Sequence, residues 1–231
     1  MGALDNAASG STTADLPAKV LVVDDHRAFA EAVGLTINSQ PDMQCVAIAR
    51  NAEEALAKVV AICPDIVLLD LGLPGKSGID ALVEIKRIRP ETRVLLISGV
   101  VTPEALIQAA DAGADGYVHK EAALTAVINA IRNSNDMVVA DRRALATINL
   151  TADISPTESA NDAYALTARE QEVLVLLADG VPAKMIAKQL GITLNTCRGY
   201  VRSILQKLDT HSQLSAVVKA AQLGLLPRLR V

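Results

Sequence analysis

The chain has 231 residues and a formal net charge of −4, and 51% of its residues are hydrophobic while 21% are charged. This composition is typical of globular proteins, and the length gives room for two ordinary domains. The longest uninterrupted apolar run, residues 173–178, is far shorter than the roughly 20 residues that cross a bilayer, so we expect no membrane span. Because the first eighteen residues contain no Lys or Arg, a secretory signal is excluded and a cytoplasmic location is favoured.

The charge is unevenly distributed along the chain. Residues 1–163 hold 13 Lys and Arg against 22 Asp and Glu, whereas residues 164–231 hold 9 against 4. A basic C-terminal part indicates contact with a polyanion, although a chance distribution of surface charge is the alternative. With no Trp and one Phe, the chain lacks the aromatic platforms on which single-stranded nucleic acid stacks.

The three cysteines, Cys45, Cys63 and Cys197, are too widely spaced for a C-x-x-C metal or redox pair, and we expect buried, reduced thiols.

The N-terminal two thirds of the chain alternate between short aliphatic runs and segments of helical period. Residues 1–17 form a predicted disordered tail, and residues 18–137 a first domain. The runs predict five buried parallel strands, at 20–23, 45–49, 66–69, 94–97 and 116–118. The segments between and after them predict helices, at 28–39, 52–62, 78–89, 103–112 and 121–133. This alternation predicts an α/β fold with a doubly wound, five-stranded parallel sheet, whose functional crevice lies at the carboxyl ends of the strands.

A polar segment separates this domain from a second one. Residues 138–163 are interpreted as a linker that opens with a short helix, and residues 164–231 as a small all-α domain. Its helices are predicted at 167–178, 182–190, 194–208 and 212–223. Thr167 and Glu170 form a capping-box pattern, and Gly180 and Gly191 fall just past helix ends.

Reactive side chains stand where the predicted strands end. Asp24 and Asp25 follow the first strand, Asp70 the third, Ser98 the fourth and Lys120 the fifth. The acids taken alone could be solvent-facing loop residues. If they converge, three carboxylates require a cation, and an oxygen-only set suits Mg²⁺. Together with a hydroxyl and an ammonium, a carboxylate nucleophile could accept a phosphoryl group.

Three enzyme classes fit this pattern less well. The segment D-L-G-L-P-G-K-S at 70–77 nearly spells a phosphate-binding P-loop, but Asp70 stands in place of the first glycine. A phosphohydrolase of the haloacid-dehalogenase type would have a second Asp two residues after the nucleophile, and here that residue is Gly72. A dinucleotide-binding Rossmann unit is excluded because no glycine fingerprint follows the first strand.

The motifs V-D-D-H at 23–26, D-L-G-L-P-G-K-S-G at 70–78, S-G at 98–99 and G-Y-V-H-K at 116–120 resemble the receiver domain of two-component response regulators. The resemblance implies a flavodoxin-like sheet of order 2-1-3-4-5 and a Mg²⁺ cofactor. It implies the following roles: Asp70 as phosphoacceptor, Asp24, Asp25, Asp70 and the backbone carbonyl of Gly72 as metal ligands, Ser98 and Lys120 as phosphate-binding residues, and Ser98 and Tyr117 as the switch. Glu121 departs from the family pattern, because many receivers have proline after the lysine.

The segment 166–223 resembles the helix-turn-helix of LuxR-type regulators in the NarL/FixJ arrangement. The quoted motifs are L-T-A-R-E-Q-E-V-L, K-M-I-A-K-Q-L-G-I-T-L-N-T and V-R-S-I-L-Q-K-L. Thr193 is expected to cap the recognition helix, and Cys197 to pack inward. The candidate DNA-binding residues are Lys184, Lys188, Arg198, Gly199, Arg202 and Lys207, of which Arg198 and Arg202 share one helix face.

The resemblances together imply a response regulator that is not a dedicated enzyme. A sensor histidine kinase would phosphorylate Asp70 in a Mg²⁺-dependent reaction, and the C-terminal domain, as a homodimer, would then bind double-stranded promoter DNA. The alternative is a protein-interaction switch controlled by the receiver, without DNA binding.

Overall fold

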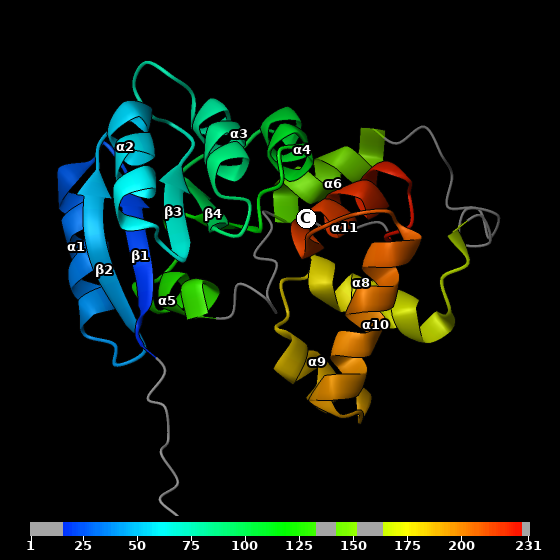
Figure 1. The fold of residues 1–231 in the computed structure, drawn as a ribbon. Helices are drawn as coiled ribbons and strands as arrows, with labels where there is room; N and C mark the ends of the chain where they lie inside the picture. Colours follow the sequence, from blue (N-terminus) through cyan, green and yellow to red (C-terminus); the bar gives the residue numbers. More distant parts are fainter. Residues whose placement is uncertain (1–15, 133–141, 152–163, 228–231) are drawn as a thin grey trace, which may run out of the picture.

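The computed structural model describes residues 16–132, 142–151 and 164–227. Most of the predicted N-terminal tail and much of the predicted linker lie outside these residues. Within them, an α/β domain and a helical domain lie side by side (Figure 1).

The α/β domain is built on a five-stranded parallel sheet of order β2-β1-β3-β4-β5, as predicted. The strands are β1 (Ala18–Val23), β2 (Met43–Ala49), β3 (Ile66–Asp70), β4 (Arg93–Ser98) and β5 (Gly116–His119). β1, β2 and β4 begin one or two residues earlier than the apolar runs predict, because backbone pairing extends beyond those runs: Ala18 still pairs with Met43.

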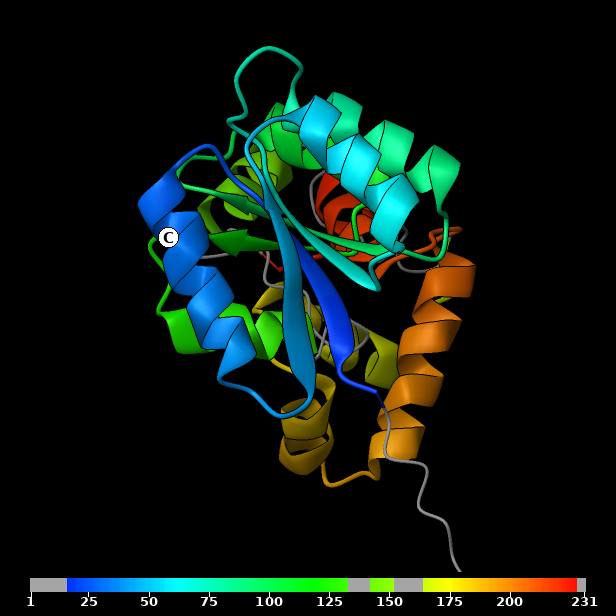
Figure 2. The same ribbon diagram turned by 60° about the vertical axis from the view of Figure 1, so that its left-hand side comes forward.

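Helices cover both faces of the sheet (Figure 2). They are α1 (Arg27–Asn38), α2 (Ala52–Ile62), α3 (Gly78–Ile88), α4 (Pro103–Asp111) and α5 (Leu124–Arg132). Successive strand residues point to opposite faces. Val20 and Val22 therefore pack in the cluster that includes α1 and α5, whereas Leu21 and Val23 pack in the cluster that includes α2, α3 and α4.

The start of α3 brings a helix against the strand that ends in Asp70. Ser77 caps this helix, because its side chain accepts a hydrogen bond from the Asp80 N–H. Gly78 follows, and a Cβ there would lie 2.4 Å from the Asp70 carbonyl oxygen and 2.7 Å from the Leu71 Cα. Both are backbone atoms, so only glycine allows α3 to start this close to the strand end.

The helical domain consists of α8 (Ala168–Ala178), α9 (Ala183–Leu190), α10 (Leu194–Lys207) and α11 (Gln213–Gln222). The predicted capping box of Thr167 and Glu170 is confirmed, as is the Thr193 cap on α10. Gly191 ends α9 in the left-handed region, at φ 66°. Pro182 occupies the N-cap position of α9 without a capping hydrogen bond from its side chain.

The two domains share an apolar interface formed by α4, α11 and the linker helix α6 (Arg142–Thr151) (Figure 1). Leu145 and Ile148 of α6 are buried in the same hydrophobic cluster as Leu106 of α4. Two hydroxyls cross the boundary: Ser212 Oγ donates to the Ala114 carbonyl at 2.8 Å, and Ser215 Oγ donates to the Ala110 carbonyl at 2.9 Å. The helical domain is therefore docked on the receiver-like domain through α11.

The expectation that all three cysteines are buried is wrong. Cys197 is buried, but Cys45 is half-buried and Cys63 is exposed. Cys63 forms the left-handed C-cap of α2, at φ 53°, and this helix end lies at the surface.

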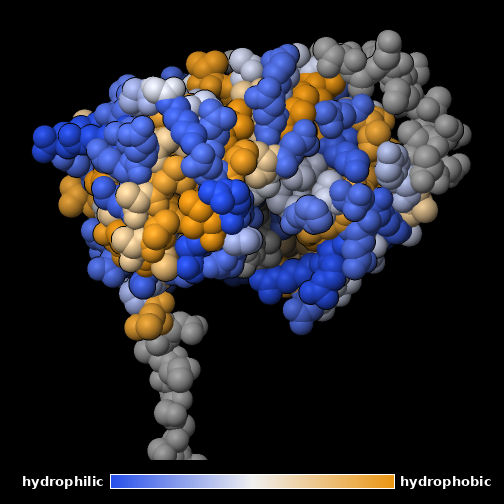
Figure 3. Space-filling model, turned by 45° about the horizontal axis from the view of Figure 1, so that its top comes forward, coloured by the Kyte–Doolittle hydropathy of each residue, from blue (hydrophilic) through white to orange (hydrophobic). Residues whose placement is uncertain are grey.

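The surface of the helical domain and the lengths of the helices are those expected from a globular composition. In the view of Figure 3, hydrophilic residues predominate over the protruding end of the helical domain. Among the described residues, no helix has the length and apolarity that a membrane span requires.

Candidate functional site

The register of the sheet brings the predicted site residues to one edge. Val23 pairs with Leu69, so Asp24 follows β1 beside the position where Asp70 ends β3. Asp70 in turn pairs with Ile97, which directly precedes Ser98. On the other side of β4, Ser98 pairs with His119, the residue before Lys120. The carboxyl ends of four neighbouring strands thus supply every side chain of the predicted site.

Lys120 is held between two buried carboxylates. Its Nζ lies 2.7 Å from Asp70 Oδ2 and 2.9 Å from Asp24 Oδ2. Asp24 is 1% exposed and Asp70 3%. Burial by itself would lower the pKa of Lys120, but the hydrogen bonds and charges of Asp70 and Asp24 outweigh it and raise the pKa. Lys120 therefore keeps its positive charge at neutral pH.

The acids at this edge fit a small divalent cation. Asp24, Asp25, His26 and Asp70 each offer one ligand atom, and these atoms lie within 4.8 Å of one another. Asp24 Oδ2 pairs with Lys120 Nζ at 2.9 Å. A single ammonium offsets only one of the three carboxylate charges, and the oxygen-rich set suits Mg²⁺.

Ser98 and Tyr117 are linked to each other and to the loop before α4. Ser98 Oγ donates to the carbonyl of Val100 at 2.6 Å, and it accepts from the Val100 N–H. The hydroxyl of Tyr117, a residue only 1% exposed, donates to the Ser98 carbonyl at 3.1 Å. Gly72 lies next to the acids, and its N–H donates to Asp70 Oδ1 at 3.1 Å.

Two neighbours of this site were not predicted from the sequence. His26, the N-cap of α1, lies with Nδ1 3.0 Å from Asp25 Oδ1. The ring centroid of Phe29 lies 5.5 Å from Lys120 Nζ. The spacing could have indicated Phe29, because it is the only phenylalanine in the chain and follows Asp25 by one helical turn.

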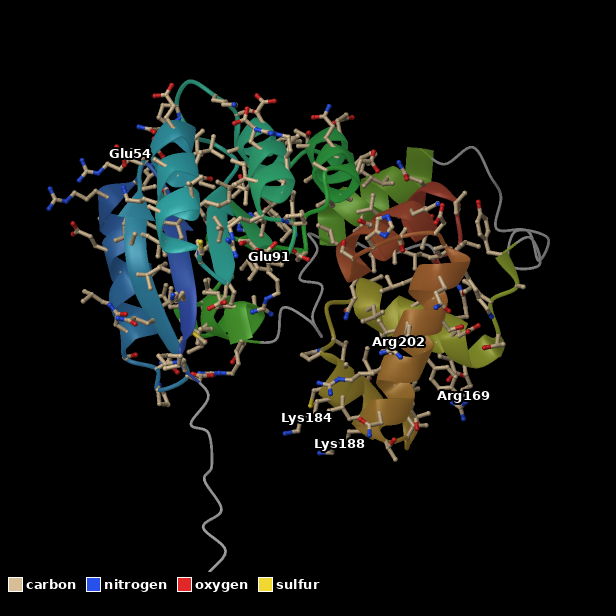
Figure 4. All side chains as sticks on the ribbon, viewed as in Figure 1. Glu54, Glu91, Arg169, Lys184, Lys188 and Arg202 are labelled. Atoms are coloured by element: carbon tan, nitrogen blue, oxygen red, sulfur yellow. The ribbon has the colours of Figure 1, made fainter. Side chains whose placement is uncertain are left out.

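A second group of predicted residues lies at the end of the helical domain that protrudes from the molecule. Lys184 and Lys188 extend from α9, and Arg202 lies on the adjacent α10 (Figure 4). All three are exposed, as are Arg198 and Gly199 of α10. The docking through α11 therefore leaves this basic surface accessible. A Cβ added to Gly199 would meet no atom within 4 Å.

Lys207, the remaining candidate for DNA binding, is ion-paired within the helical domain. Its Nζ lies 2.6 Å from Glu170 Oε2 and 2.6 Å from the Ala165 carbonyl oxygen. Because these contacts join the end of α10 to the start of α8, Lys207 stabilises the helical domain.

The sheet order and the site at its carboxyl edge define a receiver-type α/β domain joined to a helix-turn-helix domain. Comparison with known families supports both parts. Residues 20–132 match the response regulator receiver domain, and residues 164–220 match the luxR family of bacterial regulatory proteins.

Two curated relatives match most of the chain. The nitrate/nitrite response regulator protein NarL of Escherichia coli K12 is 32% identical over 205 residues, which cover 87% of this chain and 94% of NarL. The response regulator protein VraR of Staphylococcus aureus Mu3 is 30% identical over 210 residues, which cover 90% of this chain and 98% of VraR. The chain belongs to the NarL/FixJ family of two-component response regulators and is a DNA-binding transcriptional regulator. Proteins of this family are not dedicated enzymes.

One solved structure with a similar fold covers most of the chain. RcsB from Salmonella enterica serovar Typhimurium, bound to promoter rprA in the presence of phosphomimetic BeF3-, has a TM-score of 0.52 at 21% identity, over 88% of this chain and 98% of that one. A LuxR-family response regulator from Aurantimonas sp. SI85-9A1 is 33% identical over 51% of this chain and 84% of that one, with a TM-score of 0.48.

Proposed function

We propose that Asp70 accepts a phosphoryl group from a sensor histidine kinase and that this reaction controls promoter binding by the helical domain. The observation that carries the proposal is the buried Asp70 carboxylate, held 2.7 Å from Lys120 Nζ among further acids that could bind Mg²⁺. A lone buried carboxylate would be a poor acceptor, because the incoming phosphoryl group is itself negative. The ammonium and a cation supply the opposing charge.

In the proposed step, a carboxylate oxygen of Asp70 forms a bond to phosphorus. The bond between phosphorus and the kinase histidine nitrogen breaks, and its electron pair stays on the imidazole. Lys120 moves from its carboxylate partners to a phosphoryl oxygen and balances the charge there. Asp24, Asp25 and Asp70, with the Gly72 backbone carbonyl, would hold Mg²⁺, which when bound lowers the repulsion between acceptor and donor.

Ser98 and Tyr117 are the proposed switch. In the present arrangement the Ser98 hydroxyl donates to Val100 of the loop before α4. A phosphoryl oxygen on Asp70 offers a stronger, charged acceptor. When Ser98 turns to it, the Val100 contact is lost and the loop before α4 adjusts. Because Tyr117 bonds to the Ser98 carbonyl, its ring position is expected to change as well.

The proposed DNA-binding surface consists of Lys184, Lys188, Arg198, Gly199 and Arg202. Its exposure supports the proposal, since these residues are accessible while the domains are docked. The arginines of α10 would enter the major groove and reach base edges or phosphates, and the lysines of α9 would contact phosphates. We expect a homodimer on two half-sites of double-stranded DNA. With a kinase and chromosomal DNA as the proposed partners, we expect a cytoplasmic location.

The test is the intact mass of the native protein and of Asp70→Asn after incubation with acetyl phosphate and Mg²⁺. We expect the native protein to gain one phosphoryl group and Asp70→Asn to gain none, because the amide is not a nucleophile but has nearly the same shape. A parallel incubation with EDTA should abolish the gain. Equal modification of both proteins, or of neither, would refute Asp70 as the acceptor.

A further inference from the structure

The ammonium of Lys120 has a third neighbour besides its two carboxylates. The ring of Phe29 lies beneath it, with 5.5 Å between the ring centroid and Nζ. Phe29 comes from the first turn of α1. Three elements besides its own strand therefore surround the ammonium: the end of β1 with Asp24, the end of β3 with Asp70, and α1 with Phe29.

The ring is fixed on its other side by the protein core. Phe29 is partly buried and packs against the apolar cluster that contains Val20, Val33 and Ile128. A ring held in this way presents one face to the site, and the electron-rich face of an aromatic ring attracts a cation. The side chain of Lys120 is only 17% exposed, so water screens this attraction little.

A lysine at this position must do two things during the reaction. It has to leave the carboxylates for a phosphoryl oxygen, and it has to remain at the site while its four-carbon stem is free to rotate. A hydrogen bond would tie the ammonium to one partner, whereas the aromatic face attracts it without fixing a direction. The ring thus allows a short movement over the acids and opposes escape to solvent.

We propose that Phe29 is a positioning residue for phosphoryl transfer, which keeps the ammonium of Lys120 over Asp70 before and after the phosphoryl group arrives. The inference rests on the proposed function of Asp70. It assigns a role to a residue that is neither the proposed phosphoacceptor nor a proposed Mg²⁺ ligand.

The experiment compares the native protein with Phe29→Leu and Phe29→Tyr. The rate of phosphorylation by acetyl phosphate at saturating Mg²⁺ is measured for each. We expect Phe29→Leu to react about three- to tenfold more slowly, because leucine fills the apolar position but lacks the aromatic face. Phe29→Tyr should retain most of the native rate. Ile37→Val, a change at a fully buried position of the same helix and cluster, should not alter the rate.

A spectroscopic measurement separates positioning from a general loss of packing. Beryllium fluoride with Mg²⁺ mimics the phosphoryl group, and its fluorine atoms report their hydrogen-bond donors by ¹⁹F NMR. We expect one fluorine resonance to shift in Phe29→Leu but not in Phe29→Tyr or Ile37→Val.

The outcomes are distinct. Native protein that gains no phosphoryl group would overturn the proposed function, and this inference with it. Native protein that reacts while Phe29→Leu reacts equally fast, with the same ¹⁹F spectrum, would overturn the inference alone. Should Phe29→Leu fail to fold by circular dichroism, Phe29→Met replaces it, with the same expected loss of rate.

Discussion

At the scale of single residues, position decides which charges are available for binding. Lys207 and Arg202 are both basic residues of α10. Lys207 lies 2.6 Å from Glu170 Oε2, whereas Arg202 is exposed on the protruding end of the domain. A charge that is already paired in a folded domain adds little to the attraction of an external polyanion. Arg202 is therefore the residue whose loss should weaken DNA binding.

For Arg202→Ala we expect lower affinity for a labelled random-sequence duplex. The slope of log affinity against log salt concentration should become shallower by about 1, since one phosphate contact and its released counterion are lost. The measurement is fluorescence anisotropy at several salt concentrations. Arg87→Ala, at an exposed position of α3 in the receiver domain, controls for the change in net charge. A salt slope for Arg202→Ala equal to that of the native protein would contradict a phosphate contact at this residue.

At the scale of elements, Glu170 joins the start of α8 to the end of α10. Burial would raise its pKa, but hydrogen bonds from Lys207, Ser203 and Thr167 outweigh this effect and lower the pKa to about 2. The group is only 4% exposed, so the contacts are poorly screened. Compared with the ordinary value of 4.5, the shift corresponds to about 3 kcal/mol of folding stability.

The sign follows from the lowered pKa in the folded state. The contribution is complete above pH 4.5 and is lost as the pH falls from there toward 2, because protonation removes the charge that Lys207 contacts. We therefore expect Glu170→Gln to have a lower free energy of unfolding than native protein at pH 6. The difference between the two free energies should become smaller toward pH 3. Urea unfolding followed by circular dichroism at a series of pH values measures this difference in free energy. The control is Glu172→Gln, at an exposed neighbouring position, which should show no such difference. A stability difference for Glu170→Gln that did not change with pH would contradict the lowered pKa of Glu170.

At the scale of the whole molecule, the docking of α11 connects the two sites. Ser212 bonds to the carbonyl of Ala114, two residues before β5, and Ser215 bonds to the end of α4. The same α4 follows the loop that Ser98 holds through Val100. A change at Asp70 that moves Ser98 therefore has a short route to the domain interface.

For Ser215→Ala we expect the docking to weaken by about 1 kcal/mol, the usual value of one hydrogen bond between neutral groups. Alanine keeps the helix intact, because it is the best helix former. Hydrogen exchange should quicken in α4 and α11 and stay unchanged in α1. The control is Ser39→Ala, whose hydroxyl donates to the Thr36 carbonyl and accepts from the Gln40 side chain, both close in the chain. If exchange in α4 and α11 does not change, the serine contact does not hold the domains together.

The sequence by itself determined the elements and the chemistry. Aliphatic runs locate the strands because a parallel sheet buries both faces, and Thr167, Thr193 and Gly191 mark helix ends through capping that is local in the chain. The strand-end positions of Asp24, Asp70, Ser98 and Lys120 followed as well, since the carboxyl ends of parallel strands share one edge.

Only the tertiary structure decided which side chains meet across long separations. Phe29 and Lys120, Lys207 and Glu170, and Ser212 and Ala114 are brought together by packing between elements, and no local period records such pairs. The exposure of Cys63 and the docking of the helical domain through α11 likewise depend on packing between elements. The physical reason is that local sequence sets backbone conformation and burial pattern, whereas contacts between elements depend on how their surfaces fit together.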